Sequence, residues 1–243
     1  MTLLYLTADR VGLSGHGGGQ VTGQEAQALR ELAEERGEEF LCWGREELAA
    51  DDGPVAGGLA PHHYEDPWGW DTRTYSKAAA LVYRGNPAPR LVHCYAGTFT
   101  NTVEWLKSQG CKVSYTAAAH DVAASRKAHE ELGLAYDYPH LTQPDLWQRY
   151  LGGYATADVL VVPSRHSEKV MRDFGCVNRI ERVPHGVDLP KEINPLPARF
   201  TVGYLGACGA PDKGLRYLLE AWRKLDYSDA TLVLAGKDST SEW

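Results

Sequence analysis

Residues 157–164 read Ala-Asp-Val-Leu-Val-Val-Pro-Ser, and this stretch decides the fold class. A short apolar run that stops at Pro163 is typical of a buried strand in a parallel sheet. Residues 165–174 have the pattern of a helix, and residues 179–183 predict another short strand. A strand, a helix and a second strand in this order predict a parallel βαβ unit.

The helix of this unit has a recognisable start. Ser164 is a natural N-cap, because its hydroxyl can accept a hydrogen bond from a first-turn backbone N–H. Glu168 lies near the first turn, where a negative charge suits the helix dipole. We therefore interpret Ser164 and residues 165–168 as structural.

The same alternation continues on both sides of this stretch and predicts an α/β fold with a mainly parallel sheet. Expected strands are residues 3–8, 39–43, 91–95, 111–117, 200–205 and 231–235, and expected helices are residues 20–36, 100–109, 144–156 and 213–225. Residues 122–132 are polar or helical. Residues 51–75 break the rhythm with Gly, Pro and aromatic residues, and we expect a long loop or irregular insertion there.

The chain is expected to contain two domains. Residues 1–188 would form a Rossmann-like domain, and residues 189–199, which hold three prolines, would form a linker. Residues 200–243 would begin a second, incomplete Rossmann-like domain. Because segments of ~40 residues rarely bury enough apolar surface to fold alone, we expect this part to pack on the first domain, to self-associate or to bind a partner.

Composition excludes several classes of function. The chain has 243 residues, 43% of them hydrophobic, and a net charge of -7, which disfavours nonspecific nucleic-acid binding. No run approaches the ~20 apolar residues of a membrane span. The amino terminus lacks the basic segment of a signal peptide, so we expect a cytoplasmic protein.

Cysteine and histidine patterns favour neither disulfides nor metal. The five cysteines are odd in number, form no C-x-x-C motif and lie in or beside apolar stretches, so we expect buried free thiols. His62 and His63 are adjacent, and adjacent side chains point to different sides of a strand or helix. No metal site is expected.

Three groups of residues, together with Lys213, are candidates for binding phosphate or sugar. The first is the glycine-rich turn at Gly17, Gly18 and Gly19, which follows the first strand and precedes a helix. Backbone N–H groups exposed there suit a diphosphate, although a flexible turn is the alternative. The turn is neither the G-x-G-x-x-G fingerprint nor a P-loop.

The second group is His120 and Asp121, just past an expected strand end, at the edge where parallel sheets bind ligands. His120 would donate a hydrogen bond to a sugar hydroxyl and Asp121 would orient it, whereas a helix N-cap and a surface histidine are the alternative. Lys213 opens the helix of the second domain behind Gly206 and Gly209, which matches an anionic diphosphate or simply a solvated lysine.

The third group is the pair Trp68 and Trp70 in the expected long loop. Their rings would stack on a sugar of the acceptor, because aromatic faces pack well on C–H surfaces. They could equally anchor the loop to the core.

Four segments together resemble the retaining GT-B-fold glycosyltransferases of the glycosyltransferase family 4 type. They are the first strand with Gly17-Gly18-Gly19, the strand end at His120-Asp121, residues 157–164 with 180–188, and residues 202–206 with 212–214 and 218–222. The resemblance covers the whole chain but only about the first half of a family member. We therefore expect the chain to be truncated within the carboxyl-terminal domain.

The resemblance implies transfer of a sugar from a nucleotide diphosphate sugar to an acceptor, with retention of configuration and without a metal cofactor. Two Rossmann-like domains face each other across a cleft in this family, the first mostly binding the acceptor. By resemblance Gly18 and Gly19 would approach the donor diphosphate or the acceptor, His120 would contact the donor sugar, and Lys213 would neutralise the diphosphate.

Two departures from the family pattern stand out. Gly206 is followed by Ala207 and Cys208, where the family usually has an arginine that clamps the diphosphate. The family's acidic E-x7-E motif has no counterpart before Trp243, so the isolated chain is expected to be incomplete for activity. The alternatives are a non-catalytic binding or regulatory short form and a GT-B nucleotide-sugar epimerase. The missing G-x-G-x-x-G disfavours a Rossmann dehydrogenase.

Overall fold

The structure, a computed structural model, describes residues 1–7, 17–44, 67–95, 99–117, 127, 129–134, 151–186, 191–192, 195–209 and 213–236, with only the backbone for residues 17–20 and 67–70. Contacts divide the chain into two compact units. The first comprises Met1–His120 and Tyr138–His185, and the second comprises Asp121–Asp137 and Gly186–Trp243. The domain limits expected from the sequence stay a prediction.

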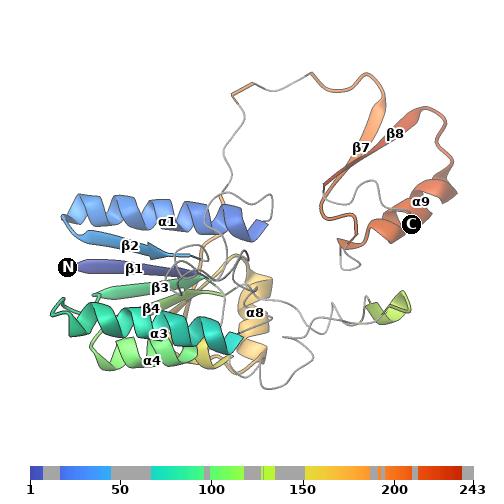
Figure 1. Ribbon diagram of the computed structural model, residues 1–243. Helices are drawn as coiled ribbons and strands as arrows, with labels where there is room; N and C mark the ends of the chain where they lie inside the picture. The colour runs from blue at the N-terminus through green and yellow to red at the C-terminus, as the bar shows by residue number, and fades with distance from the viewer. Residues whose placement is uncertain are drawn as a thin grey trace, which may run out of the picture. The chain divides into compact units, whose positions relative to one another are not determined.

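Six parallel strands form the sheet of the first unit, in the order β2-β1-β3-β4-β5-β6 (Figure 1). They are β1 (Thr2–Thr7), β2 (Glu39–Trp43), β3 (Leu91–Tyr95), β4 (Lys112–Thr116), β5 (Val159–Val162) and β6 (Arg179–Arg182). The chain runs from β1 to β2 on one side and then returns to β3 on the other, which makes the space beside β1 and β3 the topological switch point.

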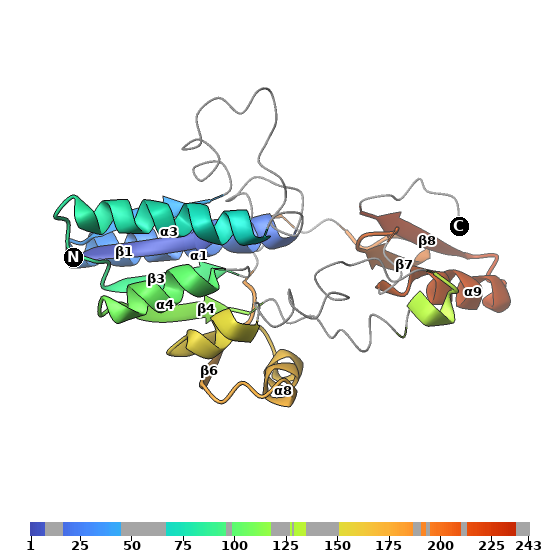
Figure 2. The same cartoon turned by 60° about the horizontal axis from the view of Figure 1, so that its bottom comes forward.

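Helices cover both faces of this sheet. Helix α1 (Gly17–Arg36) lies on one face, and α3 (Pro67–Tyr83) and α4 (Thr100–Ser108) lie on the other. Figure 2 looks onto the second face, with α3 and α4 in front of the strands. Helix α8 (Arg165–Asp173) connects β5 to β6. Because helices cover both faces, all six residues of β1 are buried, as expected for a central parallel strand.

Alternate residues of the strands supply two cores. Leu4, Leu6, Val92 and Leu160 belong to the larger core, which also includes residues of α3, α4 and α8. The opposite row, such as Tyr5 and Tyr95, packs with Ala26 of α1 in a smaller core. The smaller core leaves room for polar side chains, which become important at the functional site.

One expectation was wrong. Residues 51–75 were expected to be one irregular segment, but α3 already begins at Pro67. Its buried residues include Asp71, Thr74 and Ala78, and the two buried polar residues among them hide the apolar periodicity. Asp71 is buried because it caps α4: its carboxylate accepts hydrogen bonds from the Asn101 and Thr102 backbone N–H groups at 2.9 and 3.0 Å.

Most other boundaries agree with the sequence within one or two residues. The strand expected at residues 200–205 is observed with those limits, and the expected helix cap is confirmed. Ser164 Oγ accepts a hydrogen bond from the Ser167 backbone N–H at 3.1 Å. Helix α1 differs, because it begins at Gly17 rather than at residue 20.

The second unit contains two parallel strands, β7 (Phe200–Leu205) and β8 (Ala230–Ala235), joined by α9 (Leu215–Leu225). Every second residue of β8 is exposed, and β7 has no buried residue. Part of residues 127–134 is helical and belongs to this unit, where Tyr217 of α9 donates a hydrogen bond to the Glu131 carboxylate.

Neither a membrane span nor a metal cluster is found in the described part of the chain: no helix there is long and apolar enough to cross a bilayer, and no three His, Cys, Asp or Glu side chains there are arranged to hold a metal ion. The five cysteines are free thiols. Four of them are buried, as the sequence predicted, and Cys42 is half-buried.

Candidate functional site

The carboxyl ends of the strands are where an open parallel sheet binds ligands. In the first unit these ends are Thr7, Trp43, Tyr95, Thr116, Val162 and Arg182. Because all the strands are parallel, these ends lie at one edge of the sheet. The chain segments that follow these strand ends in the sequence contain most of the candidate site residues.

Gly17, Gly18 and Gly19 form the first turn of α1. The first backbone N–H groups of a helix have no acceptor within the helix, so they can bind an anion. The structure therefore keeps the donors that the sequence suggested but presents them from a helix rather than from a loop.

Several other predicted site residues lie outside the described part. His120 and Asp121 follow β4 by a few residues and are not described. Trp68 and Trp70 lie in the first turn of α3, where only the backbone is described. Their roles stay predictions.

A polar network that the sequence did not predict lies under α1, near this edge. The Glu25 carboxylate of α1 accepts hydrogen bonds from Tyr5 Oη at 2.9 Å and Thr116 Oγ1 at 2.6 Å. His93 Nε2 lies 3.5 Å from the same carboxylate, and His93 Nδ1 lies 2.7 Å from Ser114 Oγ. The Tyr5 and His93 rings are stacked, with centroids 5.7 Å apart. The network joins α1 to β1, β3 and β4.

The network changes the acidity of its members. Burial alone would raise the pKa of Glu25, but the hydrogen bond and charge of His93, with hydrogen bonds from Thr116 and Tyr5, outweigh burial and lower it. For Tyr5, burial and then the negative charge of Glu25 raise the pKa of the phenol. Glu25 is thus held as a carboxylate that fixes α1 on the sheet, which positions the glycine turn at the start of that helix.

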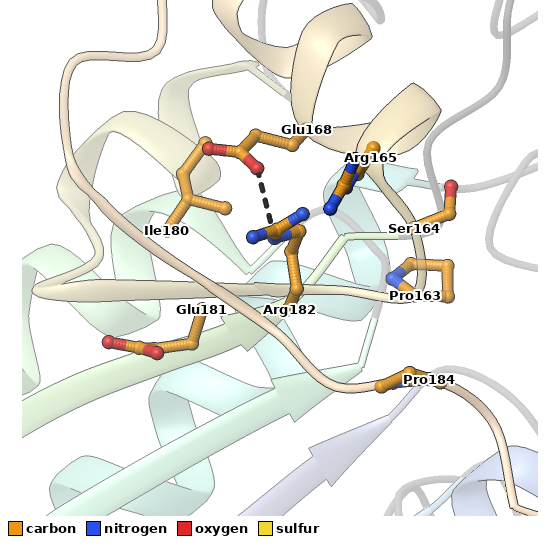
Figure 3. A pocket seen from close by; sticks show the side chains of 8 residues that line it. All are labelled: Pro163, Ser164, Arg165, Glu168, Ile180, Glu181, Arg182 and Pro184. Atoms are coloured by element: carbon orange, nitrogen blue, oxygen red, sulfur yellow. Dashed lines mark ion pairs between the residues drawn. The ribbon is translucent and has the colours of Figure 1, made fainter.

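A pocket of about 540 Å³ opens at the other end of the same edge, between α8 and β6 (Figure 3). Its walls are Pro163, Ser164, Arg165, Glu168, Ile180, Glu181, Arg182 and Pro184. Two arginines therefore line one hollow. Arg182 Nε lies 3.4 Å from Glu168 Oε2, and Arg165 has no hydrogen-bond or ion-pair partner in the described ranges.

The second unit presents a smaller group at the carboxyl ends of β7 and β8. Gly206 follows β7 and Gly236 follows β8, and the Gly206 backbone N–H donates to the Ala235 carbonyl at 3.0 Å. A Cβ at Gly236 would meet the Gly206 carbonyl oxygen at 1.8 Å, and the φ of Gly236 is +142°. Only glycine fits there, because both the space and the backbone exclude a side chain.

Lys213 lies in the segment between Gly206 and α9. Its carbonyl is 3.5 Å from Tyr204 Oη, and its side chain is exposed. Gly214, at the N-cap of α9, is left-handed with φ 71° and supplies no side-chain cap. Gly214 itself thus supplies no capping side chain to the first turn of α9, and a lysine directly precedes it, an arrangement that suits an anion.

Comparisons with known proteins establish the fold. A solved structure described as "Trehalose-6-phosphate from E. coli bound with UDP-2-fluoro glucose" matches 100% of this chain with a TM-score of 0.50 and 13% identity. The chain spans 66% of that protein's length. No protein-family model matches the chain, and no curated protein matches it significantly.

Two further structural matches have lower scores. A UDP-glucosyltransferase from Polygonum tinctorium has a TM-score of 0.44 and 11% identity, with 97% of this chain and 72% of that one covered. A putative UDP-N-acetylglucosamine 2-epimerase from Listeria monocytogenes has a TM-score of 0.44 and 10% identity, covering 98% and 63%. The first match and the parallel sheet confirm the expected α/β fold with Rossmann-like units of the GT-B type.

Sequence reasoning missed the arginine pocket and the Glu25 network for different reasons. His93 is the one polar residue in the run Leu91–Tyr95, and a polar residue in a buried strand signals a buried partner. Glu25 gives no such signal, because a glutamate on a long helix is usually solvated. Arg165 and Arg182 are 17 positions apart, and only the βαβ connection brings them to one pocket.

Proposed function

We propose that this protein is a GT-B glycosyltransferase that moves a sugar from a nucleotide diphosphate sugar to an acceptor with retention of configuration. The observation that carries the proposal is Lys213, which follows β7 by a few residues and directly precedes Gly214, the N-cap of α9 that has no side chain. The full-chain match to a GT-B-fold protein described with a bound UDP sugar supports the same function.

The chemistry assigned to each residue follows from charge. Departure of a nucleoside diphosphate leaves negative charge on its phosphate oxygens, and a cation placed there stabilises the transition state. Lys213 would supply that cation, with the α9 amides. Gly17, Gly18 and Gly19 would approach the diphosphate or the acceptor, because glycine lets a ligand come close to the backbone.

The remaining roles are carried over from the family resemblance. His120 would hydrogen-bond the donor sugar, Asp121 would orient His120, and Trp68 and Trp70 would stack on the acceptor. We also propose that no metal ion is needed, since Lys213 and backbone amides supply the positive charge. Activity unchanged by EDTA is the expected result. The cytoplasmic location and self-association stay predictions.

A donor-binding assay tests the proposal. A panel of nucleotide diphosphate sugars is titrated into the protein by calorimetry, and the best donor is repeated with K213Q and with the control K224Q. Lys224 carries the same charge at the other end of α9. We expect K213Q to weaken binding about tenfold, as loss of one charge-assisted contact does, and K224Q to bind normally. If no donor binds, or if both variants bind like the wild type, the proposal is wrong.

The product identifies the reaction. NMR of the sugar product with its acceptor reports the anomeric configuration, and retention is expected. Incubation with donor alone distinguishes an epimerase, because an epimerase would convert the donor without an acceptor.

A further inference from the structure

We propose that the pocket between α8 and β6 binds the phosphate group of a small phosphorylated molecule, which within the proposed function is the acceptor. The assignment of an acceptor rests on that function, whereas phosphate binding at the pocket does not. The residues that carry the inference are Arg165, Arg182 and Glu168.

The first argument is the number of charges around the pocket. Arg165 and Arg182 line it together with Glu168 and Glu181. Glu181 is already bound to Arg179, whose Nε lies 2.6 Å from Glu181 Oε1. Each of the two carboxylates therefore already has an arginine partner, and the positive charge of Arg165 is left over in a protein with a net charge of -7.

The second argument is the direction of the side chains. In Figure 3 the Arg165 and Arg182 side chains are directed toward the same space between α8 and β6, while the Glu181 carboxylate points away from them. Two guanidinium groups that face one space repel each other unless an anion lies between them. Their planar N–H forks match phosphate oxygens well.

The third argument is the weakness of the present counter-charge. Glu168 meets Arg182 through one contact of 3.4 Å, and both side chains are partly exposed, at 34% and 46%. An exposed pair of this kind contributes little to stability, because water screens the two charges. A phosphate that forms two-pronged hydrogen bonds would displace Glu168 readily, and Arg165 has no partner to give up in the described ranges.

The size and walls of the pocket indicate more than a free ion. Its volume of about 540 Å³ lies within the range of small-molecule sites, roughly 300–1,000 Å³. Pro163, Ile180 and Pro184 provide apolar walls beside the charges. Apolar walls suit the C–H face of a sugar ring, so a sugar phosphate fits this composition. The position at the carboxyl edge of the sheet is where α/β proteins bind ligands.

The test measures binding of a hexose 6-phosphate, the same hexose without phosphate, and UDP to the full chain by calorimetry. The variants are R165Q, the double variant R165Q/R182Q, and E168Q. The control is R216Q, which removes the same charge from the exposed Arg216–Glu220 pair of the second unit. Circular dichroism verifies folding, and R165Q serves alone if the double variant is unfolded, because Arg165 bonds to nothing in the described ranges.

We expect the hexose phosphate to bind and the plain hexose not to bind. R165Q should weaken binding about tenfold and the double variant further, since each substitution removes charge-assisted hydrogen bonds to the phosphate. E168Q should strengthen binding severalfold, because it removes the competing carboxylate, and R216Q should have no effect. If the two arginines were solvated and did not bind phosphate, E168Q would not increase the affinity for the hexose phosphate.

Equal affinity of the wild type and R165Q, or no binding of the hexose phosphate, overturns the proposal. Weakening of UDP binding alone would assign the pocket to the donor diphosphate and contradict an acceptor phosphate. Failure of the proposed function is a separate result: if no donor binds but the hexose phosphate behaves as expected, the pocket stands and the glycosyltransferase does not.

Discussion

β1 and β7 are the first strands of the two units, and each has six residues and pairs only with parallel strands. Their environments nevertheless differ completely. Every residue of β1 is buried, whereas none of β7 is. Leu6 is 0% exposed and Leu205 is 86% exposed, although both stand at or next to the end of their strands. The two strands differ because helices cover them to different extents. Helices pack on both faces of the sheet around β1, whereas α9 of the second unit buries only Leu215 among its residues.

The two units thus use similar elements for different purposes. In the first unit the strands and helices share one continuous apolar core, and the side chains of this core stabilise the unit. In the described part of the second unit little apolar surface is buried. The most constrained contact there is the close approach of the Gly206 and Gly236 backbones. Stability should therefore depend on side chains in the first unit and on backbone geometry in the second.

The largest expected effect comes from matched leucines. L6A should lower the free energy of unfolding by about 2–5 kcal/mol, because it leaves a cavity in the core. L205A should change it by less than about 0.5 kcal/mol, as at other exposed sites. Urea denaturation followed by circular dichroism measures both. Comparable losses in the two variants would show that Leu205 is covered in solution and would remove the contrast.

A matched pair of glycines tests the second unit. G236A should destabilise this unit by about 3 kcal/mol, since the new Cβ would collide with the Gly206 carbonyl and φ is positive. G203A, in open space within β7, should be tolerated. Hydrogen exchange of the β7 and β8 amides reports the effect locally. Unchanged protection in G236A would contradict the observed backbone contact.

The cap of α4 gives a smaller effect in the first unit. D71A should cost about 2 kcal/mol, because the Asn101 and Thr102 backbone N–H groups lose their acceptor in a buried place. The start of α9 differs from the start of α4, because its N-cap residue Gly214 has no side chain to accept a hydrogen bond. Thermal unfolding of D71A should show early loss of the first unit. A wild-type melting temperature would mean that other groups hold the start of α4.

The smallest effect depends on pH. The pKa of Glu25 is lowered in the folded protein, so the folded state favours the carboxylate. Its contribution is present at neutral pH and is lost as the pH falls below the ordinary value of 4.5 toward the folded pKa. E25Q should cost about 1 kcal/mol at pH 7 and lose less stability than the wild type between pH 5 and pH 3.

The control for this pH effect is E220Q, which removes an exposed glutamate that pairs with Arg216 on α9. Its acid denaturation profile should follow the wild type. If E25Q and the wild type lose stability in parallel on acidification, the Glu25 network does not contribute as described.

The sequence was sufficient to predict the order of most strands and helices along the chain, but not the residues that come together at the site. The apolar run Val159–Val162, with Pro163 and Ser164 behind it, predicted the βαβ unit because each residue type has a local reason. Helix α3 was missed, because the buried Asp71 and Thr74 look like surface residues, and the burial of Asp71 is explained only by its hydrogen bonds to Thr102 of α4. A partner 30 positions away cannot be read from local pattern.

The candidate site shows the same limit. Gly236 looks like an ordinary glycine after a strand, and only the pairing of β7 with β8 brings it against Gly206. Lys213 was predicted from its place before a helix, which is a local feature. The arginine pocket was not predicted, because it depends on two strand ends and a helix that come together only in the folded sheet.

We propose that a nucleotide diphosphate sugar binds at the carboxyl edge of β7 and β8, near the segment that holds Lys213. The most direct measurement of this binding is calorimetric titration of the nucleotide-sugar panel into the wild type, K213Q and K224Q. The account predicts one donor that binds the wild type and K224Q alike and K213Q about tenfold more weakly. A donor that binds all three proteins equally, or no donor binding at all, would contradict it.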